Sequence, residues 1–340
     1  MTAADITKHP RRGRQITGGA GALCLALAAL TFAAAVSAQS PPSAAAASAS
    51  AVGPPLELVV LGSGGPGATG RAGASYLVLV DGVPRILVDA GPGSFARLGE
   101  AKLSLAKTDI VLLTHLHIDH AGELPGLFKA RAVAGGGPIT FKVFGPAGHK
   151  GKGDDASFPS TSRFIDLLFG KQGAFGYLKD FSAPMTLKVS DIDTTAVPSG
   201  APRPKTIFSE ADLVIRAVAG HHRDAPAVIY RIDHAGKSIT FSGDIDAGGL
   251  AGLRSIAGDT SLLVFNSVVL DPPGSAAILY TLHTPPKTIG EIADEGRVQQ
   301  LLLSHLSPTI EHERSAVEAS VAGRYKGPIA FARDGLRVVP

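Results

Sequence analysis

Four histidine and aspartate side chains lie within six residues in the stretch Thr114-His115-Leu116-His117-Ile118-Asp119-His120. This stretch directly follows the apolar run 110–113, which predicts a buried strand. Alternate side chains of an extended chain point to the same side, so His115 and His117 would project together. The following turn would bring Asp119 and His120 to a neighbouring point. The spacing therefore predicts a site for two adjacent metal ions, and zinc suits such imidazole and carboxylate ligands.

Runs rich in apolar and β-branched residues predict strands on both sides of this stretch. In the first half they cover 56–60, 76–80, 85–88, 110–113 and 139–143, and in the second half 213–218, 227–232, 238–241, 262–265, 300–303 and 329–332. Helices are predicted over 125–133, 162–169, 286–295 and 311–322. Two mixed halves of this kind indicate an α/β fold in which two sheets pack face to face with helices outside, as a single αββα domain over 56–340.

The N-terminus has the pattern of a secretory signal peptide over 1–38. A basic stub ending at Arg14 precedes the uncharged, Ala- and Leu-rich run 18–35, and small residues up to Ala38 suit cleavage there. The alternative is an uncleaved membrane anchor, although the run barely reaches the length of a membrane span. Residues 39–55 are a low-complexity linker of Pro, Ser and Ala. The predicted location is therefore periplasmic or secreted, with no stable membrane insertion after cleavage.

The composition excludes several function classes once the leader is removed. The 340 residues are 45% hydrophobic and 18% charged, a globular profile. The leader holds four of the 32 Lys and Arg residues and one of the 29 Asp and Glu residues, which leaves 28 of each. This neutral balance predicts no nucleic-acid partner. The single cysteine, Cys24, lies in the leader, so the mature chain has no thiol nucleophile.

The histidine stretch resembles the signature of the metallo-β-lactamase superfamily. The turns Leu-Gly-Ser-Gly at 61–64 and Leu-Val-Asp-Ala-Gly-Pro-Gly at 87–93 look like the opening elements of that family. Gly-Pro-Ala-Gly at 145–148 resembles a turn of its ribonuclease Z-like and arylsulfatase-like branches. The resemblance extends from about Leu56 to Arg337. It implies the four-layer αββα sandwich and two zinc ions, with iron or manganese as alternatives.

Three further ligands are expected downstream, each at the end of a predicted strand. His222 is favoured over His221 because it lies at the right distance from the Pro-Ala-Val-Ile-Tyr-Arg strand at 226–231. Asp244 occurs in Ser-Gly-Asp, and His305 in Leu-Ser-His-Leu. Each residue alone is more typical of a turn or of a buried core histidine. Their order and their shared strand-end positions together favour metal binding.

The resemblance also assigns roles within the site. His115, His117 and His222 would hold one zinc ion, Asp119, His120 and His305 would hold the other, and Asp244 would bridge them. Asp89 would hydrogen-bond a ligand histidine, the alternative being a turn carboxylate. Asp119 and His283 are the expected catalytic side chains, with His283 as general acid; the alternative is that His283 is exposed to water before a helix.

These roles imply an exported dinuclear zinc hydrolase whose metal-bridging hydroxide attacks a small-molecule phosphodiester or sulfate ester. One departure from the branch weakens the ribonuclease mechanism: Phe265-Asn266 replaces its usual His-Glu pair. The alternatives are a lactonase or β-lactamase-like hydrolase of cyclic esters or amides, and a non-catalytic, metal-bound periplasmic binding protein. The sequence does not fix the oligomeric state, and a dimer is compatible with it.

Overall fold

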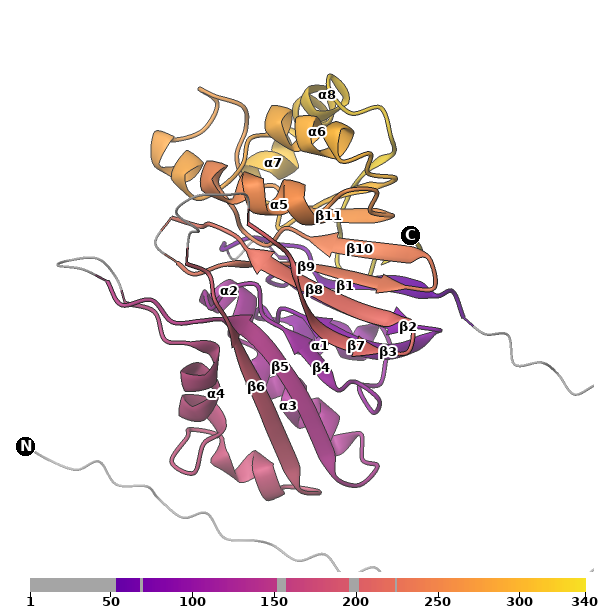
Figure 1. Ribbon diagram of the computed structural model, residues 1–340, viewed down its shortest axis with the longest axis vertical. Helices are drawn as coiled ribbons and strands as arrows, with labels where there is room; N and C mark the ends of the chain where they lie inside the picture. Colours follow the sequence, from indigo (N-terminus) through magenta and orange to yellow (C-terminus); the bar gives the residue numbers. More distant parts are fainter. Residues whose placement is uncertain (1–52, 68–69, 152–156, 196–201, 224) are drawn as a thin grey trace, which may run out of the picture. The chain divides into compact units, whose positions relative to one another are not determined.

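The fold is built from two mixed β-sheets whose strands alternate with short helices along the chain (Figure 1). The computed structural model describes residues 53–67, 70–151, 157–195, 202–223 and 225–340. The predicted leader 1–38 and the predicted linker up to residue 52 lie outside the described residues. The described residues all belong to one compact unit, Ala49–Pro340.

The first sheet has seven strands in the order β14-β1-β2-β3-β4-β5-β6. Its strands are β1 (Leu56–Gly62), β2 (Ser75–Val80), β3 (Val83–Val88), β4 (Ile110–Leu112), β5 (Ile139–Pro146), β6 (Met185–Ile192) and β14 (Arg337–Val338). β1, β2 and β3 pair antiparallel, whereas β3, β4, β5 and β6 pair parallel. Asp81 and Gly82 join β2 to β3 with φ angles of 51° and 79°, as a two-residue hairpin turn requires.

The second sheet also has seven strands, in the order β13-β12-β11-β10-β9-β8-β7. Its strands are β7 (Lys205–Glu210), β8 (Leu213–Ala219), β9 (Val228–His234), β10 (Lys237–Phe241), β11 (Leu262–Asn266), β12 (Leu301–Ser304) and β13 (Ile329–Phe331). The strands from β7 to β10 pair antiparallel and those from β10 to β13 pair parallel. Each sheet therefore has a hairpin half and a parallel half.

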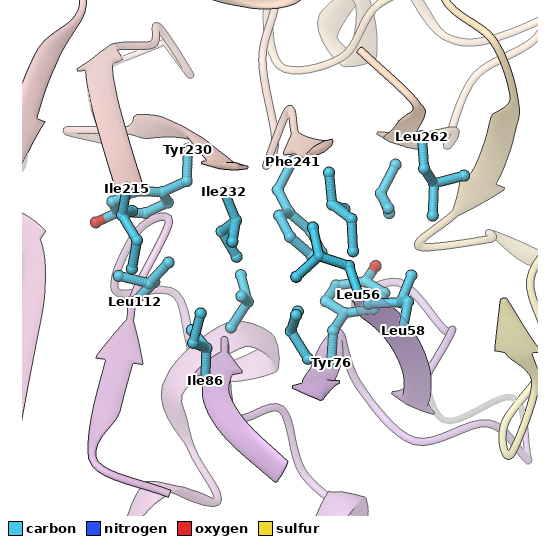
Figure 2. Packing of buried hydrophobic residues seen from close by; sticks show 14 of the residues in the cluster. Leu56, Leu58, Tyr76, Ile86, Leu112, Ile215, Tyr230, Ile232, Phe241 and Leu262 are labelled. Atoms are coloured by element: carbon cyan, nitrogen blue, oxygen red, sulfur yellow. The ribbon is translucent and has the colours of Figure 1, made fainter. Parts of the chain in front are cut away.

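The main hydrophobic core lies between the two sheets (Figure 2). Leu56 and Leu58 of β1 face this core, and the alternating Val59 faces the helices on the other side of the sheet. Opposite β1 and β2, Phe241 of β10 places its ring centroid 5.4 Å from that of Tyr76. Each fully buried side chain of this size contributes roughly 1.5–3 kcal/mol to folding. The shared core makes the two sheets one folding unit.

Helices cover the outer faces of the sheets. The helices are α1 (Ser94–Glu100), α2 (Ile118–Ala121), α3 (Leu124–Val133), α4 (Thr161–Phe169), α5 (Leu250–Ile256), α6 (Pro286–Glu295), α7 (Pro308–His312) and α8 (Arg314–Ala322), with 3₁₀ turns η1 (Gly176–Asp180), η2 (Ala247–Gly249) and η3 (Ala277–Thr281). Phe128 of α3 stacks on Phe141 of β5 at 4.3 Å between ring centroids. α5, α6 and α8 pack on the second sheet in another apolar cluster. This arrangement confirms the predicted αββα sandwich.

The structure differs from the sequence prediction at several elements. The helix predicted over 311–322 is two helices, α7 and α8, which meet at Glu313. The strands β6 and β7 and the helices α1 and α5 were not expected. β6 and β7 are the edge strands of their sheets, and most of their residues are partly or fully exposed. β6 carries the alternating apolar residues Met185, Leu187 and Val189, a pattern that the prediction did not use, whereas β7 has no such alternation.

The carboxyl ends of β4, β10 and β12 lie at the same end of the sandwich, because the segments that follow them meet there. This end carries the histidine-rich stretch 115–120. Within the described part of the chain, none of the helices is both long and apolar enough to span a bilayer.

Candidate metal centre

The segment after β4 places three histidines at the end of the first sheet. His117 is the extended N-cap of α2, with φ −63° and ψ 151°, so the chain turns immediately after the alternating His115 and His117. The turn returns His120 beside His115, with ring centroids 4.0 Å apart. His115 and His120 are fully buried. The local geometry is thus the extended end and turn that the spacing predicts.

The second sheet contributes three more of the predicted residues from the ends of its strands. His222 lies in the connection between β8 and β9, Asp244 follows β10, and His305 follows β12. All three side chains are almost completely buried. His305 has a left-handed φ of 55°, an uncommon conformation for a residue other than glycine. The site therefore lies where both sheets present the carboxyl ends of their parallel strands.

The carboxylate of Asp244 lies at the middle of this group. Its Oδ2 atom is 3.6 Å from Nε2 of His120 and of His305, 3.8 Å from Nε2 of His222 and 4.0 Å from Nε2 of His115. Asp119 lies at the periphery, with Oδ2 3.1 Å from Nε2 of His305. Four overlapping groups of donor atoms lie close enough to share an ion: His115, His117 and His222; His115, His120 and Asp244; Asp119, His120 and His305; and His222, Asp244 and His283.

The structure thus brings together all seven residues that the sequence proposes as metal ligands, and His283 lies beside them. Two of the four groups have the composition expected for the two ions, and the division of the ligands between two ions stays a prediction. His221, the rejected neighbour of His222, instead pairs with Asp246 and is half-exposed.

Unpartnered buried nitrogens indicate that the site fits metal ions. Nε2 of His115, Nε2 of His120 and Nδ1 of His283 are buried without a hydrogen-bond partner among the described residues. A buried polar atom without a partner costs roughly 1–3 kcal/mol. Nε2 of His115 and Nε2 of His120 are the atoms with which a neutral imidazole binds a cation, so bound cations would give both of them a partner.

Hydrogen bonds outside the centre fix which nitrogen of each ring faces inward. Asp89 accepts hydrogen bonds from the backbone N and the hydroxyl of Thr114 at 2.7 and 2.8 Å, and from Nδ1 of His120 at 2.8 Å. The backbone carbonyl of Leu282 accepts from Nδ1 of His222 at 2.7 Å. Both rings therefore carry their proton on Nδ1 and direct Nε2 to the centre. Asp89 makes the expected contact with a histidine of the site.

Asn266, at the end of β11, has a role that sequence reasoning did not identify. Its Nδ2 donates a hydrogen bond to Oδ1 of Asp244 at 2.6 Å, and both residues are buried. This contact orients the carboxylate so that Oδ2 is the atom that faces the histidines. The position of Asn266 at the end of a strand was the available signal. The sequence prediction treated the residue only as part of the Phe-Asn pair that replaces the usual His-Glu pair.

The two carboxylates of the centre, Asp119 and Asp244, are held in their ionised form. Burial would raise the pKa of Asp244, but the charges of His305 and His120 hold it well below its usual value. Burial would also raise the pKa of Asp119, but the hydrogen bond with His305 outweighs it and lowers this pKa to about 2. Burial lowers the pKa of His115 well below 6.5, and the neighbouring His120 adds to this. Burial would lower the pKa of His120, but the charges of Asp244 and Asp89 raise it well above 6.5, so a bound cation would displace the proton from its Nε2.

His283 lies in the connection between η3 and α6 and is buried rather than exposed to water. Its Nδ1 is 3.9 Å from Oδ2 of Asp244, and its ring centroid is 5.3 Å from that of His222. Burial lowers the pKa of His283 to about 4. The ring is therefore neutral at pH 7 and adjoins the centre on the side of His222.

Most of the chain resembles proteins of a known family. Residues 68–280 match the model of a family described as the metallo-beta-lactamase superfamily. A ribonuclease Z from Mycobacterium sp. (strain KMS) is 26% identical over 268 residues, which cover 75% of this chain and 85% of the relative.

Solved structures agree at the level of the fold. The short form of human tRNase Z has a TM-score of 0.61 and 20% identity, over 84% of this chain and 99% of that one. The Zn2+-bound PqqB of Methylobacterium extorquens has a TM-score of 0.56 and 16% identity, over 83% of this chain and 99% of that one.

These relatives correct one prediction from the sequence. The neutral charge of the mature chain led to the expectation that nucleic acid is not a partner. That expectation is wrong, because relatives that match three quarters of the chain are named ribonucleases, whose substrate is RNA. A net charge is a sum over the whole chain and does not report how cations are distributed around a site.

Proposed function

The chain belongs to the metallo-beta-lactamase superfamily and is a metal-dependent hydrolase, and we propose that it is an exported phosphodiesterase that uses two zinc ions. The observation that carries this proposal is the position of Asp244, whose Oδ2 lies within 3.6–4.0 Å of nitrogen atoms of five histidines. A carboxylate in this position is placed to be shared between two ions.

The protein side chains divide the work of the centre. His115, His117 and His222 would hold one ion, Asp119, His120 and His305 the other, and Asp244 both. When bound, two cations lower the pKa of a water molecule and stabilise negative charge on the substrate. Asp89 and the carbonyl of Leu282 keep the ligand rings in the tautomer that this binding needs.

His283 would move the proton that the leaving group requires. The ring is neutral at pH 7, so it does not carry that extra proton in the resting site. Negative charge on a substrate beside it would raise its pKa and favour the protonated, donating form. The ring is held in the buried segment between η3 and α6, next to His222. Its position suits transfer to an atom on that side of the centre.

Phosphodiesters are favoured over other substrates by the relatives. The curated relatives are named ribonuclease Z, and the bonds that a ribonuclease cleaves are phosphodiesters. No thiol is available in the mature chain to serve as a nucleophile. The reaction we propose is therefore direct hydrolysis of a phosphodiester, whose substrate can be a strand of RNA or a smaller diester.

Hydrolysis of a chromogenic phosphodiester and of a chromogenic aryl sulfate by the zinc-loaded protein tests this proposal. We expect turnover of the phosphodiester, and we expect Asp244→Ala to lower it by more than about 100-fold and to lower the zinc content. Asp259→Ala is the control, because Asp259 only forms an exposed surface pair with Arg297. Folded protein with two zinc ions that hydrolyses neither ester would overturn the assignment, and a preference for the sulfate would move it to sulfatases.

Export is a separate part of the proposal and rests on the leader predicted over 1–38. Sequencing the N-terminus of the protein isolated from its native cell tests it. We expect the mature chain to begin at Gln39, in a periplasmic or secreted fraction. A chain that retains its first residues in the cytosolic fraction would contradict export while leaving the proposed hydrolysis intact.

A further inference from the structure

A cavity lies beside the metal centre, on the side of His117 and His222. Its volume is about 300 Å³, and its walls come from the segment after β5, the segment after β6 and the connection between β8 and β9. His221 and Arg223, which flank His222, line one side of it. His149 lines it as well and pairs with Phe158, whose ring lies 6.1 Å from that of His117. Two residues that line the cavity are therefore the immediate chain neighbours of the proposed ligand His222.

The cavity has the chemistry of an anion site. Its described walls carry the guanidinium of Arg223, the rings of His149 and His221 and the hydroxyls of two threonines, Thr194 and Thr195, and none of these described lining residues is acidic. The nearby carboxylate of Asp193 already accepts hydrogen bonds from the backbone N and the hydroxyl of Thr195. This side of the centre thus offers donors and a cation, whereas the centre itself holds three carboxylates within its network.

Asp246 holds this wall in one conformation. It is buried and accepts hydrogen bonds from Nδ1 of His221 at 2.8 Å, from the backbone N of Gly248 at 2.7 Å and from the backbone N of Arg223 at 3.0 Å. A Cβ at Gly248 would lie 2.8 Å from the His221 ring, so the two pack closely. These contacts fix the ring of His221 and the direction of the backbone at Arg223.

The backbone at Arg223 has a left-handed conformation that Asp246 stabilises. Arg223 has a φ of 54°, in the left-handed region that favours glycine. Such a conformation costs of order 1 kcal/mol and persists only where the surroundings enforce it. Here the buried carboxylate of Asp246 enforces it. The structure keeps an arginine, rather than glycine, at a strained position beside the ligand His222.

We propose that this cavity binds a second anionic group of the substrate, a phosphate beyond the scissile ester, and that Arg223 is its main contact. The inference rests on the proposed phosphodiesterase function and adds a specificity for substrates with a further phosphate. A planar guanidinium with several N–H donors matches the oxygens of a phosphate. His149 lines the same cavity and adds a histidine to the walls around that group.

Two nucleotide esters that differ by one phosphate test the proposal. The first is thymidine 5′-(4-nitrophenyl phosphate), and the second carries an additional 3′-phosphate. We expect the zinc-loaded protein to show a kcat/KM about tenfold higher for the second ester, carried by KM, because one charge-assisted contact has roughly that effect. We expect Arg223→Gln to erase this ratio and Arg223→Lys to restore part of it.

Binding without turnover gives an independent readout. Calorimetry compares thymidine 3′,5′-bisphosphate with thymidine 5′-monophosphate, and we expect the bisphosphate to bind about tenfold tighter in the wild type and equally in Arg223→Gln. The backbone N–H of Arg223 that braces Asp246 is retained in both variants. Arg216→Gln is the matched control, because Arg216 lies on β8 and pairs with Asp233 outside this cavity.

Each outcome decides one part of the inference. Equal kcat/KM values for the two esters in the wild type would overturn the second subsite. A wild-type preference that survives in Arg223→Gln would overturn the role of Arg223. If neither ester is hydrolysed, the phosphodiesterase proposal fails, and the calorimetry alone decides whether the cavity takes the additional phosphate.

Discussion

At the scale of single residues, the chemistry of the centre depends on which oxygen of Asp244 faces the histidines. Asn266 decides this, because its amide binds Oδ1 at 2.6 Å and leaves Oδ2 for the four Nε2 atoms around it. An amide is a neutral donor, so it orients the carboxylate without competing for the metal ions. Asn266, which departs from the usual His-Glu pair of the ribonuclease Z-like branch, therefore positions the carboxylate of Asp244.

Replacing Asn266 should loosen the centre without removing a ligand. In Asn266→Ala, Oδ1 of Asp244 loses its buried donor, and we expect zinc affinity to fall by roughly 10–100-fold. Asn266→Asp keeps the size of the side chain but sets two carboxylates against each other, so its loss should be at least as large. Competition with a chromogenic zinc chelator measures both affinities. Unchanged zinc affinity in both variants would show that Asp244 is oriented by the metal ions alone.

The spacing of the first histidines and the family resemblance led to the residues that the structure brings together, including the contact of Asp89 with His120, but not to the other supporting contacts. His222 could be separated from His221 because the distance to the following strand is a local property of the sequence. The pairing of His221 with Asp246 joins residues 25 positions apart through space, as does the contact between Asp89 and Thr114. No local pattern encodes such pairs, since they depend on how strand ends meet.

At the scale of elements, one carboxylate joins three strands of the first sheet. Asp109, directly before β4, accepts hydrogen bonds from Arg85 of β3 at 2.7 Å and from Lys142 of β5 at 2.8 Å. Arg85 also pairs with Glu210 of β7, in the other sheet. Burial would raise the pKa of Asp109, but these hydrogen bonds outweigh it and hold the pKa below its usual value of 3.8.

The lowered pKa predicts how the stability contribution of Asp109 depends on pH. A carboxyl whose pKa is lower in the folded state stabilises the protein above its unfolded pKa and stops doing so as the pH falls through the folded pKa. We expect Asp109→Asn to lower the free energy of unfolding by about 1 kcal/mol at pH 7, because the site is half-buried. The difference from the wild type should shrink below about pH 4.

Urea unfolding of the wild type and of Asp109→Asn between pH 7 and pH 3 measures this. Asp259→Asn is the control, since its partner Arg297 is exposed and such surface pairs contribute little. A difference that stays constant across the whole pH range would mean that Asp109 acts by packing rather than by charge.

Elements with strong apolar patterning were predictable, and polar elements were not. β4 and β11 are completely buried and read as continuous apolar runs, as strands covered on both faces do. β6 and β7 carry Thr, Lys, Ser and Glu at the sheet edges and gave no such signal. The break between α7 and α8 at Glu313 was also missed, because the residues on both sides favour helix.

At the scale of the whole molecule, charge illustrates the limit of averages. Residues 39–340 contain equal numbers of acidic and basic residues, yet the described walls of the cavity beside the centre carry an arginine and two histidines while the centre is rich in carboxylates. A polyanionic substrate responds to this local arrangement rather than to the sum. The same reasoning explains why the neutral balance misled the prediction about nucleic acid.

Metal removal should destabilise the whole molecule, because the proposed ligands come from both sheets. His115, His117, Asp119 and His120 follow β4 of the first sheet, whereas His222, Asp244 and His305 follow strands of the second. Ions that bind only the folded state add stability by mass action, about 4 kcal/mol when free zinc is 1,000 times its Kd. Since the two sheets share one core, the loss should lower Tm in a single transition.

Calorimetry with zinc and with a chelator measures this, and Asp244→Ala should show a smaller difference between the two conditions. An unchanged Tm after chelation, or separate melting of the two sheets, would contradict a centre that joins them.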